Sequence, residues 1–235
     1  MPADKKYSNC YIRQRPQQTW QFQGEQFDPA YWQQQPGYRP TDGGRGGSCL
    51  IEVDGQRAVL RRYLRGGAVS RVLTDRYLWL GRGLSRPWRE WEILLRAREA
   101  GLPVPEPIGA CVCRSFIWYR AALITAFLED TEMLTQRLRR EKLAADSWHR
   151  LGLLIKRMHV AGICHADLNS DNILIDSQDR FYLIDFDRAR VVKQLDDWQW
   201  QPLYRLQRSI DKRHRQQALN CDEDDWQALM DGYQS

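Results

Sequence analysis

The stretch that decides the fold is HADLNSDNILI (residues 165–175), followed by YLIDFD (residues 182–187). It predicts a loop that carries Asp167 and Asn172, and then a hairpin of two short strands that ends at Asp185. Two carboxylates and a carboxamide would meet at one end of this hairpin. Oxygen ligands of this kind suit Mg²⁺. An Asp that is not a ligand can orient an alcohol and accept its proton.

Before this stretch, the pattern predicts mainly strands. Residues 49–53 and 56–63 read as strands joined by the turn Asp54-Gly55. Two further strands are expected at 116–119 and 122–125. The Gly-rich sequence TDGGRGGSC (41–49) comes directly before the first pair.

Two helices flank the later strands. Ser85 reads as the N-cap of a helix that ends at Gly101, and prolines 103, 105 and 107 prevent its continuation. A second helix is expected from a cap at Asp146 or Ser147 to Gly162, and the polar tail from Val191 reads as helical. Residues 1–40 read as an irregular segment rich in Gln and aromatic residues. Together the pattern predicts an α+β protein of two lobes, with an extension at 1–40, a β-rich lobe at 41–127 and a mainly helical lobe at 128–235.

Composition narrows the class of protein. The chain has 235 residues, 43% of them hydrophobic, and a formal net charge of +5. These values exclude a disordered chain, and the length suffices for a core without disulfide staples. No secretory signal is visible, and the longest charge-free apolar stretch, Ala121–Leu128, is too short to cross a bilayer. The six Cys form no CxxC motif, so we expect reduced thiols in a cytoplasm.

Arginines are concentrated in one span. From Arg57 to Arg98 there are 11 Arg, no Lys and three acids, a surplus of +8. Scattered Arg commonly forms a solvated face. An anionic partner such as a membrane surface, a phosphorylated ligand or nucleic acid is the functional alternative, and charge does not choose between them.

The stretch at 165–187 resembles the kinase superfamily, whose catalytic loop reads HxDxxxxN and is followed by a hairpin and DFx. The resemblance implies ATP and Mg²⁺ as cofactors, Asp167 as catalytic base, and Asn172 and Asp185 as metal ligands. It also implies further ATP-binding residues: Gly43, Gly44, Gly46 and Gly47 in the phosphate-covering loop, Arg61 with its ion-pair partner Glu90, and Thr125 and Phe127 in the hinge that meets adenine. Arg62 is the alternative to Arg61 if the strand slips by one residue.

Several positions depart from the protein-kinase pattern. Arg61 replaces the usual Lys, Ala166 the Arg of HRD, and Asp187 the Gly of DFG. No APE motif follows, and only 50 residues come after Asp185. These departures favour a small-molecule or glycolipid kinase over a protein kinase.

Four segments, REWEILLRAREAGLPVPEPIGA, HADLNSDNILID, FYLIDFDRAR and LYRLQRSIDK, resemble the bacterial lipopolysaccharide core kinases. The resemblance implies a protein-kinase-like fold and ATP-dependent phosphorylation of the 4-hydroxyl of a Kdo sugar on a lipid A precursor. It also implies a peripheral position on the cytoplasmic face of the inner membrane, where the Arg and Trp content suits an anionic membrane surface. No nucleic acid partner is expected, and no protein partner can be inferred.

Alternatives remain open at this point. They are a heptose kinase of the same core, a protein kinase, and a pseudokinase that binds a membrane or nucleic acid through its Arg-rich span. We further expect His165 to support the loop, and Asp171 and Asp176 to serve as loop and turn residues. Asp187, Arg188 and Arg190 are candidate acceptor contacts.

Overall fold

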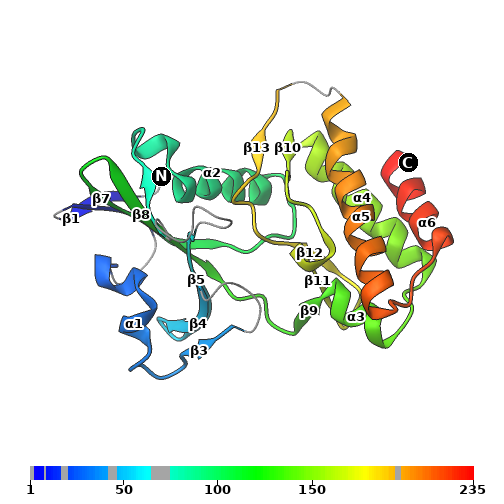
Figure 1. Cartoon of the computed structure of the whole chain (residues 1–235), viewed down its shortest axis with the longest axis horizontal. Coiled ribbons are helices and arrows are strands. Elements are labelled where there is room, and N and C mark those ends of the chain that lie inside the picture. Colours follow the sequence, from blue (N-terminus) through cyan, green and yellow to red (C-terminus); the bar gives the residue numbers. More distant parts are fainter. Residues whose placement is uncertain (1–2, 8, 17–20, 42–46, 65–74, 194–196) are drawn as a thin grey trace. The chain divides into compact units, whose positions relative to one another are not determined.

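The computed structural model describes residues 3–7, 9–16, 21–41, 47–64, 75–193 and 197–235. The chain folds into two compact units, one formed by residues 1–92 and 106–127 and the other by residues 93–105 and 128–235. Figure 1 traces both units from the blue N-terminus to the red C-terminus. The helix α2 begins in the first unit and ends in the second.

The first unit is built on an antiparallel sheet with the strand order β1-β2-β7-β8-β5-β4-β3, and β6 pairs with β8. Its elements are β1 (Ala3–Tyr7), β2 (Cys10–Gln14), η1 (Gly24–Phe27), α1 (Pro29–Trp32), β3 (Arg39–Pro40), β4 (Ser48–Val53), β5 (Gln56–Arg62), β6 (Tyr77–Leu78), η3 (Arg82–Leu84), α2 (Arg86–Glu99), β7 (Pro107–Ser115) and β8 (Trp118–Ala126). The predicted hairpin of β4 and β5 is confirmed, and Asp54 and Gly55 both have positive φ, as a two-residue hairpin turn requires.

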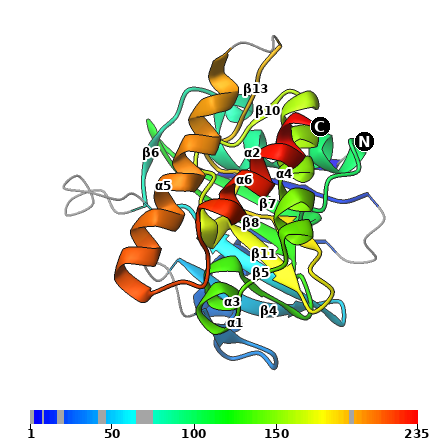
Figure 2. The ribbon, with the colours of Figure 1, turned by 90° about the vertical axis from the view of Figure 1, so that its right-hand side faces the viewer.

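The second unit is mainly helical. Its elements after α2 are β9 (Thr131–Met133), α3 (Leu134–Arg140), α4 (Ala145–Val160), β10 (Ile163–Cys164), η4 (Ser170–Asn172), β11 (Ile173–Asp176), β12 (Phe181–Leu183), β13 (Arg190–Val191), η5 (Asp197–Gln199), α5 (Trp200–Gln217) and α6 (Glu223–Gln234). The predicted hairpin of β11 and β12 is present, and β9 extends it to three strands. The helix α6 packs against α4, and in Figure 2 it is seen between α4 and α5.

The first 40 residues correct the expectation of an irregular segment. They contain β1, β2, α1 and β3, and β2 pairs with β7 along Cys10–Gln14. Phe22, Phe27 and Trp32 are buried in the hydrophobic core of the first unit. The period-2 pattern of β2 is short and interrupted by charge, which explains why the sequence alone does not reveal it.

The pairing of β2 with β7 also corrects the expectation of reduced thiols. Cys10 lies opposite Cys113 in this register, and the two form a disulfide. Because β2 was not expected as a strand, nothing in the sequence indicated that these residues face each other. Cys49, Cys111, Cys164 and Cys221 are free thiols.

Two further local expectations were wrong. Residues 116–119 do not form a strand of their own: Phe116, which has a positive φ, and Ile117 make the turn between β7 and β8, and only Trp118 and Tyr119 are extended, as the start of β8. The helix α4 has Ala144 as its N-cap, without a side-chain hydrogen bond, so neither Asp146 nor Ser147 caps it. Asp146 forms an ion pair with Arg150 instead, and Ser147 donates a hydrogen bond to Asp179.

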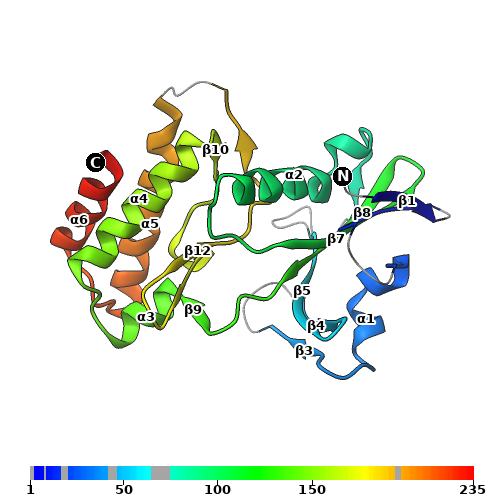
Figure 3. The ribbon, with the colours of Figure 1, turned by 180° about the vertical axis from the view of Figure 1, so that it is seen from behind.

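The helices α4 and α6 meet at two glycines, and Figure 3 shows the pair from behind. A Cβ at Gly152 would lie 2.0 Å from the carbonyl oxygen of Leu229, and a Cβ at Gly232 would lie 2.0 Å from that of His149. The backbones therefore approach too closely for any larger residue. Buried side chains on the same face of α4, among them Trp148, complete the packing.

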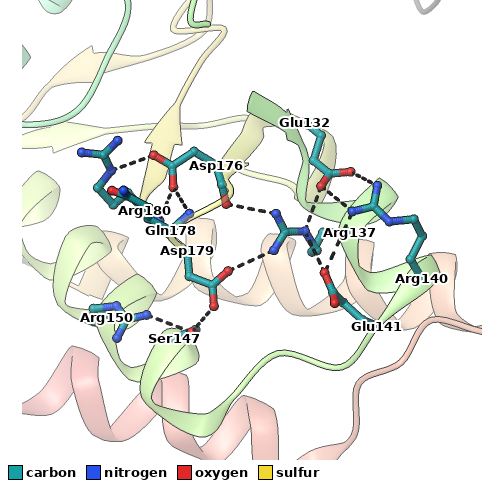
Figure 4. A network of polar contacts seen from close by, with 10 residues as sticks. All are labelled: Glu132, Arg137, Arg140, Glu141, Ser147, Arg150, Asp176, Gln178, Asp179 and Arg180. Atoms are coloured by element: carbon teal, nitrogen blue, oxygen red, sulfur yellow. Dashed lines mark hydrogen bonds and ion pairs between the residues drawn. The ribbon is translucent and has the colours of Figure 1, made fainter. Parts of the chain in front are cut away.

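A polar network fixes the end of the β11–β12 hairpin to α3 and α4 (Figure 4). Arg137 of α3 lies at its centre and bonds to Glu132, to Asp179 and to the carbonyl oxygen of Asp176. The carboxylate of Asp176 accepts the backbone N–H groups of Gln178 and Arg180, which closes the turn. The network therefore holds the hairpin in a fixed position within this unit.

Candidate active site

His165 anchors the loop that follows β10. Its ring is fully buried, its Nε2 lies 2.9 Å from the carbonyl oxygen of Ile184, and its centroid is 4.7 Å from that of Phe186. Burial lowers the pKa of His165, so the ring is neutral at pH 7 and Nε2–H donates to the carbonyl. The prediction that His165 supports the loop is confirmed.

The backbone of Asp167 is held from two sides. The Nδ2 atoms of Asn169 and Asn172 donate to the carbonyl oxygen of Asp167 over 2.9 Å and 3.0 Å. The carboxylate of Asp167 is partly exposed and forms an ion pair with Arg205 of α5. A fixed backbone with an accessible carboxylate is the arrangement that a general base needs.

Asn172 presents its amide oxygen. The Nδ2 group of Asn172 donates its hydrogen bond to the carbonyl oxygen of Asp167, and this bond fixes the orientation of the amide. The other atom of the amide, Oδ1, points away from that carbonyl and can accept a hydrogen bond or bind a cation. The backbone carbonyl of Asn172 accepts the N–H of Ile184 over 3.0 Å. One residue therefore connects the loop to the second strand of the hairpin.

Asp185 is placed by the same hydrogen bonds. The preceding residue, Ile184, is bound through its N–H to Asn172 and through its carbonyl to His165. Asp185 itself has a φ of 61°, a left-handed conformation that Asp tolerates better than most residues. The structure thus brings the backbones of Asp167, Asn172 and Asp185 together within the second unit.

These residues fit the ligand set of a magnesium ion. Asn172 offers an amide oxygen whose orientation is fixed by the bond of its Nδ2 group, and Asp185 offers a carboxylate. Mg²⁺ takes one or two such ligands and keeps positions for water and phosphate oxygens. Asp171 and Asp176 are engaged in structural contacts, Asp171 with Thr135 and Arg213 and Asp176 in its turn. Their predicted roles as loop and turn residues are confirmed.

The predicted ion pair of the first unit is present. Arg61 of β5 donates to both carboxylate oxygens of Glu90, and the hydroxyl of Tyr63 donates to the same carboxylate. Glu90 is 2% exposed. Burial, and then the charge of Glu90, raise the pKa of Tyr63 well above its usual value, so the phenol remains a hydrogen-bond donor.

The alternative register is not used. Arg62 lies on the other face of β5 and pairs with Asp75 at 2.8 Å and with Asp28 at 3.7 Å. Strand alternation therefore assigns the contact with Glu90 to Arg61. The role of Arg61 toward phosphate stays a prediction.

The other residues that the sequence predicts to bind nucleotide are placed less fully. Gly43, Gly44 and Gly46 lie outside the described residues. Gly47 accepts the backbone N–H of Arg62 at its carbonyl over 2.6 Å, immediately before β4. Thr125 pairs with Val59 within the sheet, and the N–H of Phe127 donates to the carbonyl of Arg57 over 3.0 Å. Contact of Thr125 and Phe127 with adenine stays a prediction.

Sequence reasoning missed the cations of α5. Arg205, Arg208, Lys212 and Arg213 line a groove beside the loop that follows β10, and Arg205 contacts Asp167. The signal was available as basic residues at helical spacing. It was overlooked because the denser Arg span at residues 57–98 dominated the charge pattern.

Comparison with known proteins finds relatives that match most of this chain. A model described as the lipopolysaccharide kinase (Kdo/WaaP) family matches residues 30–233. A 3-deoxy-D-manno-octulosonic acid kinase of Pasteurella multocida is 37% identical over 217 residues, which cover 89% of this chain and 90% of the relative. The enzyme of the same name from Actinobacillus succinogenes is 38% identical over 216 residues, with the same coverage. That of Vibrio vulnificus strain YJ016 is 35% identical over 209 residues, covering 89% and 88%.

A solved structure, WaaP in complex with acyl carrier protein, matches with a TM-score of 0.56 and 19% identity over 82% of this chain and 76% of that chain. At this identity the likeness shows the fold alone, and the predicted α+β, protein-kinase-like class is confirmed. The family model and the curated relatives define a kinase, a phosphotransferase with an alcohol acceptor. The chain belongs to the lipopolysaccharide kinase (Kdo/WaaP) family.

Proposed function

We propose that the protein transfers the γ-phosphoryl group of ATP to the 4-hydroxyl of a Kdo (3-deoxy-D-manno-octulosonic acid) residue on a lipid A precursor, in lipopolysaccharide core biosynthesis. The observation that carries the proposal is the hydrogen-bonded arrangement of Asp167, Asn172 and Asp185. The acceptor is supported by relatives that are named for Kdo and align over 89% of this chain.

In this proposal Asp167 is the catalytic base. Its carboxylate orients the sugar hydroxyl toward the γ-phosphorus and takes the hydroxyl proton as the new O–P bond forms. The bond from the γ-phosphorus to the bridging oxygen breaks, and ADP leaves. Phosphoryl transfer depends on such positioning more than on covalent chemistry.

Asn172 and Asp185 would hold Mg²⁺, which would neutralise the charge of the transferred phosphoryl group. Arg61, oriented by Glu90, would bind the phosphate chain, and the backbone of the glycines at 43–47 would cover it. Thr125 and Phe127 would lie at the adenine. The Arg61–Glu90 bond supports this assignment because it holds the guanidinium in a fixed position at the end of β5.

We further propose a peripheral position on the cytoplasmic face of the inner membrane. No helix in the described part of the chain is long and apolar enough to cross a bilayer. The net charge of +5 favours an anionic surface.

An acceptor panel tests the function. The protein is incubated with γ-labelled ATP, Mg²⁺ and one of three acceptors: a Kdo-bearing lipid A precursor, a heptose-containing core oligosaccharide and a generic protein substrate. We expect label in the Kdo acceptor alone. NMR of that product should show the new phosphate on O4 of the Kdo residue. Label in the heptose acceptor alone would show that the acceptor is heptose and not Kdo, and the kinase chemistry would still hold. Label in the protein substrate alone would contradict a glycolipid kinase.

A further inference from the structure

The second unit contains a basic groove of about 900 Å³. It lies between the loop after β10 and the helix α5, and all of its lining residues fall between Cys164 and Arg215. Six cations line it: Arg190, Arg205, Arg208, Lys212, Arg213 and Arg215. Among the described residues that line it, Asp171 is the one acidic residue.

Most of this positive charge is uncompensated. Arg205 pairs with Asp167, and Arg213 pairs with Asp171. Arg190, Arg208, Lys212 and Arg215 form no ion pair with any described residue. Like charges three or four residues apart on a helix repel one another, and α5 carries such pairs at 205/208, 208/212 and 212/215. A bound anion would relieve this repulsion.

The groove borders the catalytic carboxylate. Arg205 lines the groove and at the same time contacts Asp167, while Ala166 and Asn169, on either side of Asp167 in the loop, also line it. A molecule that fills the groove is thereby directed toward the proposed base.

The groove also carries an aromatic end. Tyr204 lines it and is 61% exposed, and Trp200, one helical turn earlier on α5, is 51% exposed. The guanidinium of Arg208 lies 5.7 Å from the centroid of the Tyr204 ring. Cations beside exposed aromatic rings suit an amphiphile with a polyanionic head and an apolar part. From Arg205 to Arg215 the helix rises about 15 Å at 1.5 Å per residue, which is room for more than one anionic group.

We propose that this groove binds the phosphate and carboxylate groups of the glycolipid acceptor. Arg190, Arg208 and Lys212 serve as its anion contacts, and Arg205 forms the boundary between the acceptor and Asp167. The inference rests on the proposed function for the identity of the acceptor, and the groove extends that function to the residues that recognise the acceptor.

The test uses Arg208→Ala, Lys212→Ala and the double variant, with Lys156→Ala as the matched control. Arg208 and Lys212 are exposed cations of α5 that do not touch Asp167 in this structure, and Lys156 is a cation of α4 outside the groove. Binding of the Kdo-bearing lipid A precursor is measured by calorimetry in detergent, with its phosphates intact and after their enzymatic removal. Steady-state kinetics are measured in parallel and give KM for the acceptor and KM for ATP.

We expect the double variant to raise the Kd for the phosphorylated acceptor by about tenfold or more, because two charge-assisted contacts are lost. The effect should shrink for the dephosphorylated acceptor, and KM for ATP should not change. Lys156→Ala should bind like the wild type. Unchanged acceptor affinity in the double variant would overturn the proposal.

Two further arms separate the possible sources of the anion. Equal loss of binding to phosphatidylglycerol vesicles and to the acceptor would assign the groove to the membrane surface and overturn acceptor recognition. The wild type could bind the acceptor without transferring a phosphoryl group to it, while the double variant loses this binding. That result would support acceptor binding by the groove and contradict the proposed function. Phosphoryl transfer by the wild type, together with unchanged acceptor affinity in the double variant, would support the proposed function while contradicting the role of the groove.

Discussion

The carboxylate of Glu90 is almost completely buried, and it receives hydrogen bonds from Arg61 and Tyr63. A buried carboxylate is stable as an anion only while such donors are present. The residue that we propose to bind ATP phosphates is therefore also part of the internal structure of the first unit. Stability and nucleotide affinity should respond to the same substitution.

Arg61→Ala should lower the free energy of unfolding by roughly 3 kcal/mol, since it removes one partner of a buried pair. It should also raise KM for ATP by a larger factor than it raises KM for the acceptor. Chemical denaturation and steady-state kinetics measure the two effects. Arg62→Ala is the matched control, because its more exposed pair with Asp75 should contribute about 1 kcal/mol or less. Equal behaviour of the two variants would contradict the assignment of Arg61.

At the scale of elements, the second unit depends on the close approach of α4 and α6. Gly to Ala in a helix normally stabilises it by about 1 kcal/mol. Here the added methyl group would overlap a carbonyl oxygen of the other helix. Packing therefore outweighs helix propensity at both positions.

Gly152→Ala and Gly232→Ala should each destabilise the protein by about 2 kcal/mol or more, because the helices must move apart. Thermal and chemical unfolding provide the measurement. Gly83→Ala is the control, since an added Cβ there meets nothing within 4 Å. A rise in stability at Gly152 would show that the helices do not cross as described.

A buried histidine joins three elements of the same unit. The hydroxyl of Tyr233 in α6 donates to Gln199 of η5, and Nδ1 of His159 in α4 lies 2.8 Å from that hydroxyl oxygen. Because the phenol has a single proton, Nδ1–H must be the donor in the second bond. Burial, and then the neighbouring His165, lower the pKa of His159 to about 4.

The pKa of His159 predicts a loss of stability in acid. Below the unfolded pKa of 6.5 the unfolded chain takes up a proton that the folded chain takes up only near pH 4. The free energy of unfolding should therefore fall between pH 6.5 and 4, by up to about 3 kcal/mol from His159. Denaturant titrations of wild type and His159→Gln measure the difference. His165, whose pKa is also lowered, should leave a residual slope in the variant. If the free energy of unfolding of wild type and of His159→Gln changed with pH in the same way, the assignment of a buried, neutral His159 ring would be contradicted.

For the whole molecule, the sequence predicted the elements with strong local signals and missed those defined by partners far along the chain. The Asp-Gly hairpin, α2, α4 and the β11–β12 hairpin were visible from turn residues and periodicity. β2 and β7 were not, because their pairing joins residues about a hundred positions apart and β7 begins at the last of three closely spaced prolines. The disulfide between Cys10 and Cys113 was hidden for the same reason.

The candidate site shows the same division. The kinase-like motif indicated Asp167, Asn172 and Asp185, and the hydrogen bonds of Ile184 to Asn172 and His165 explain how that spacing brings the three residues together. Arg61 and Arg62 could be distinguished only after the register of β5 was known. The groove of α5 required the tertiary structure, because its residues meet the loop that carries Asp167 across about 40 positions of sequence.

Charge acts at the scale of the whole molecule. With a net charge of +5, the protein should bind vesicles that contain phosphatidylglycerol and not vesicles of phosphatidylcholine alone. Cosedimentation should fall steeply as the salt concentration rises, because exposed charges are screened. Binding to both vesicle types that does not depend on salt would contradict an electrostatic encounter.

The most direct measurement compares Asp167→Asn with the wild type in transfer of label from γ-labelled ATP to the Kdo-bearing lipid A precursor. The account predicts that the variant loses about 10²–10⁴-fold in kcat, as expected for a missing general base, while its affinity for Mg-ATP is unchanged. Asp224→Asn, an exposed carboxylate of α6, should behave like the wild type. Wild-type turnover by Asp167→Asn would contradict the account at its centre.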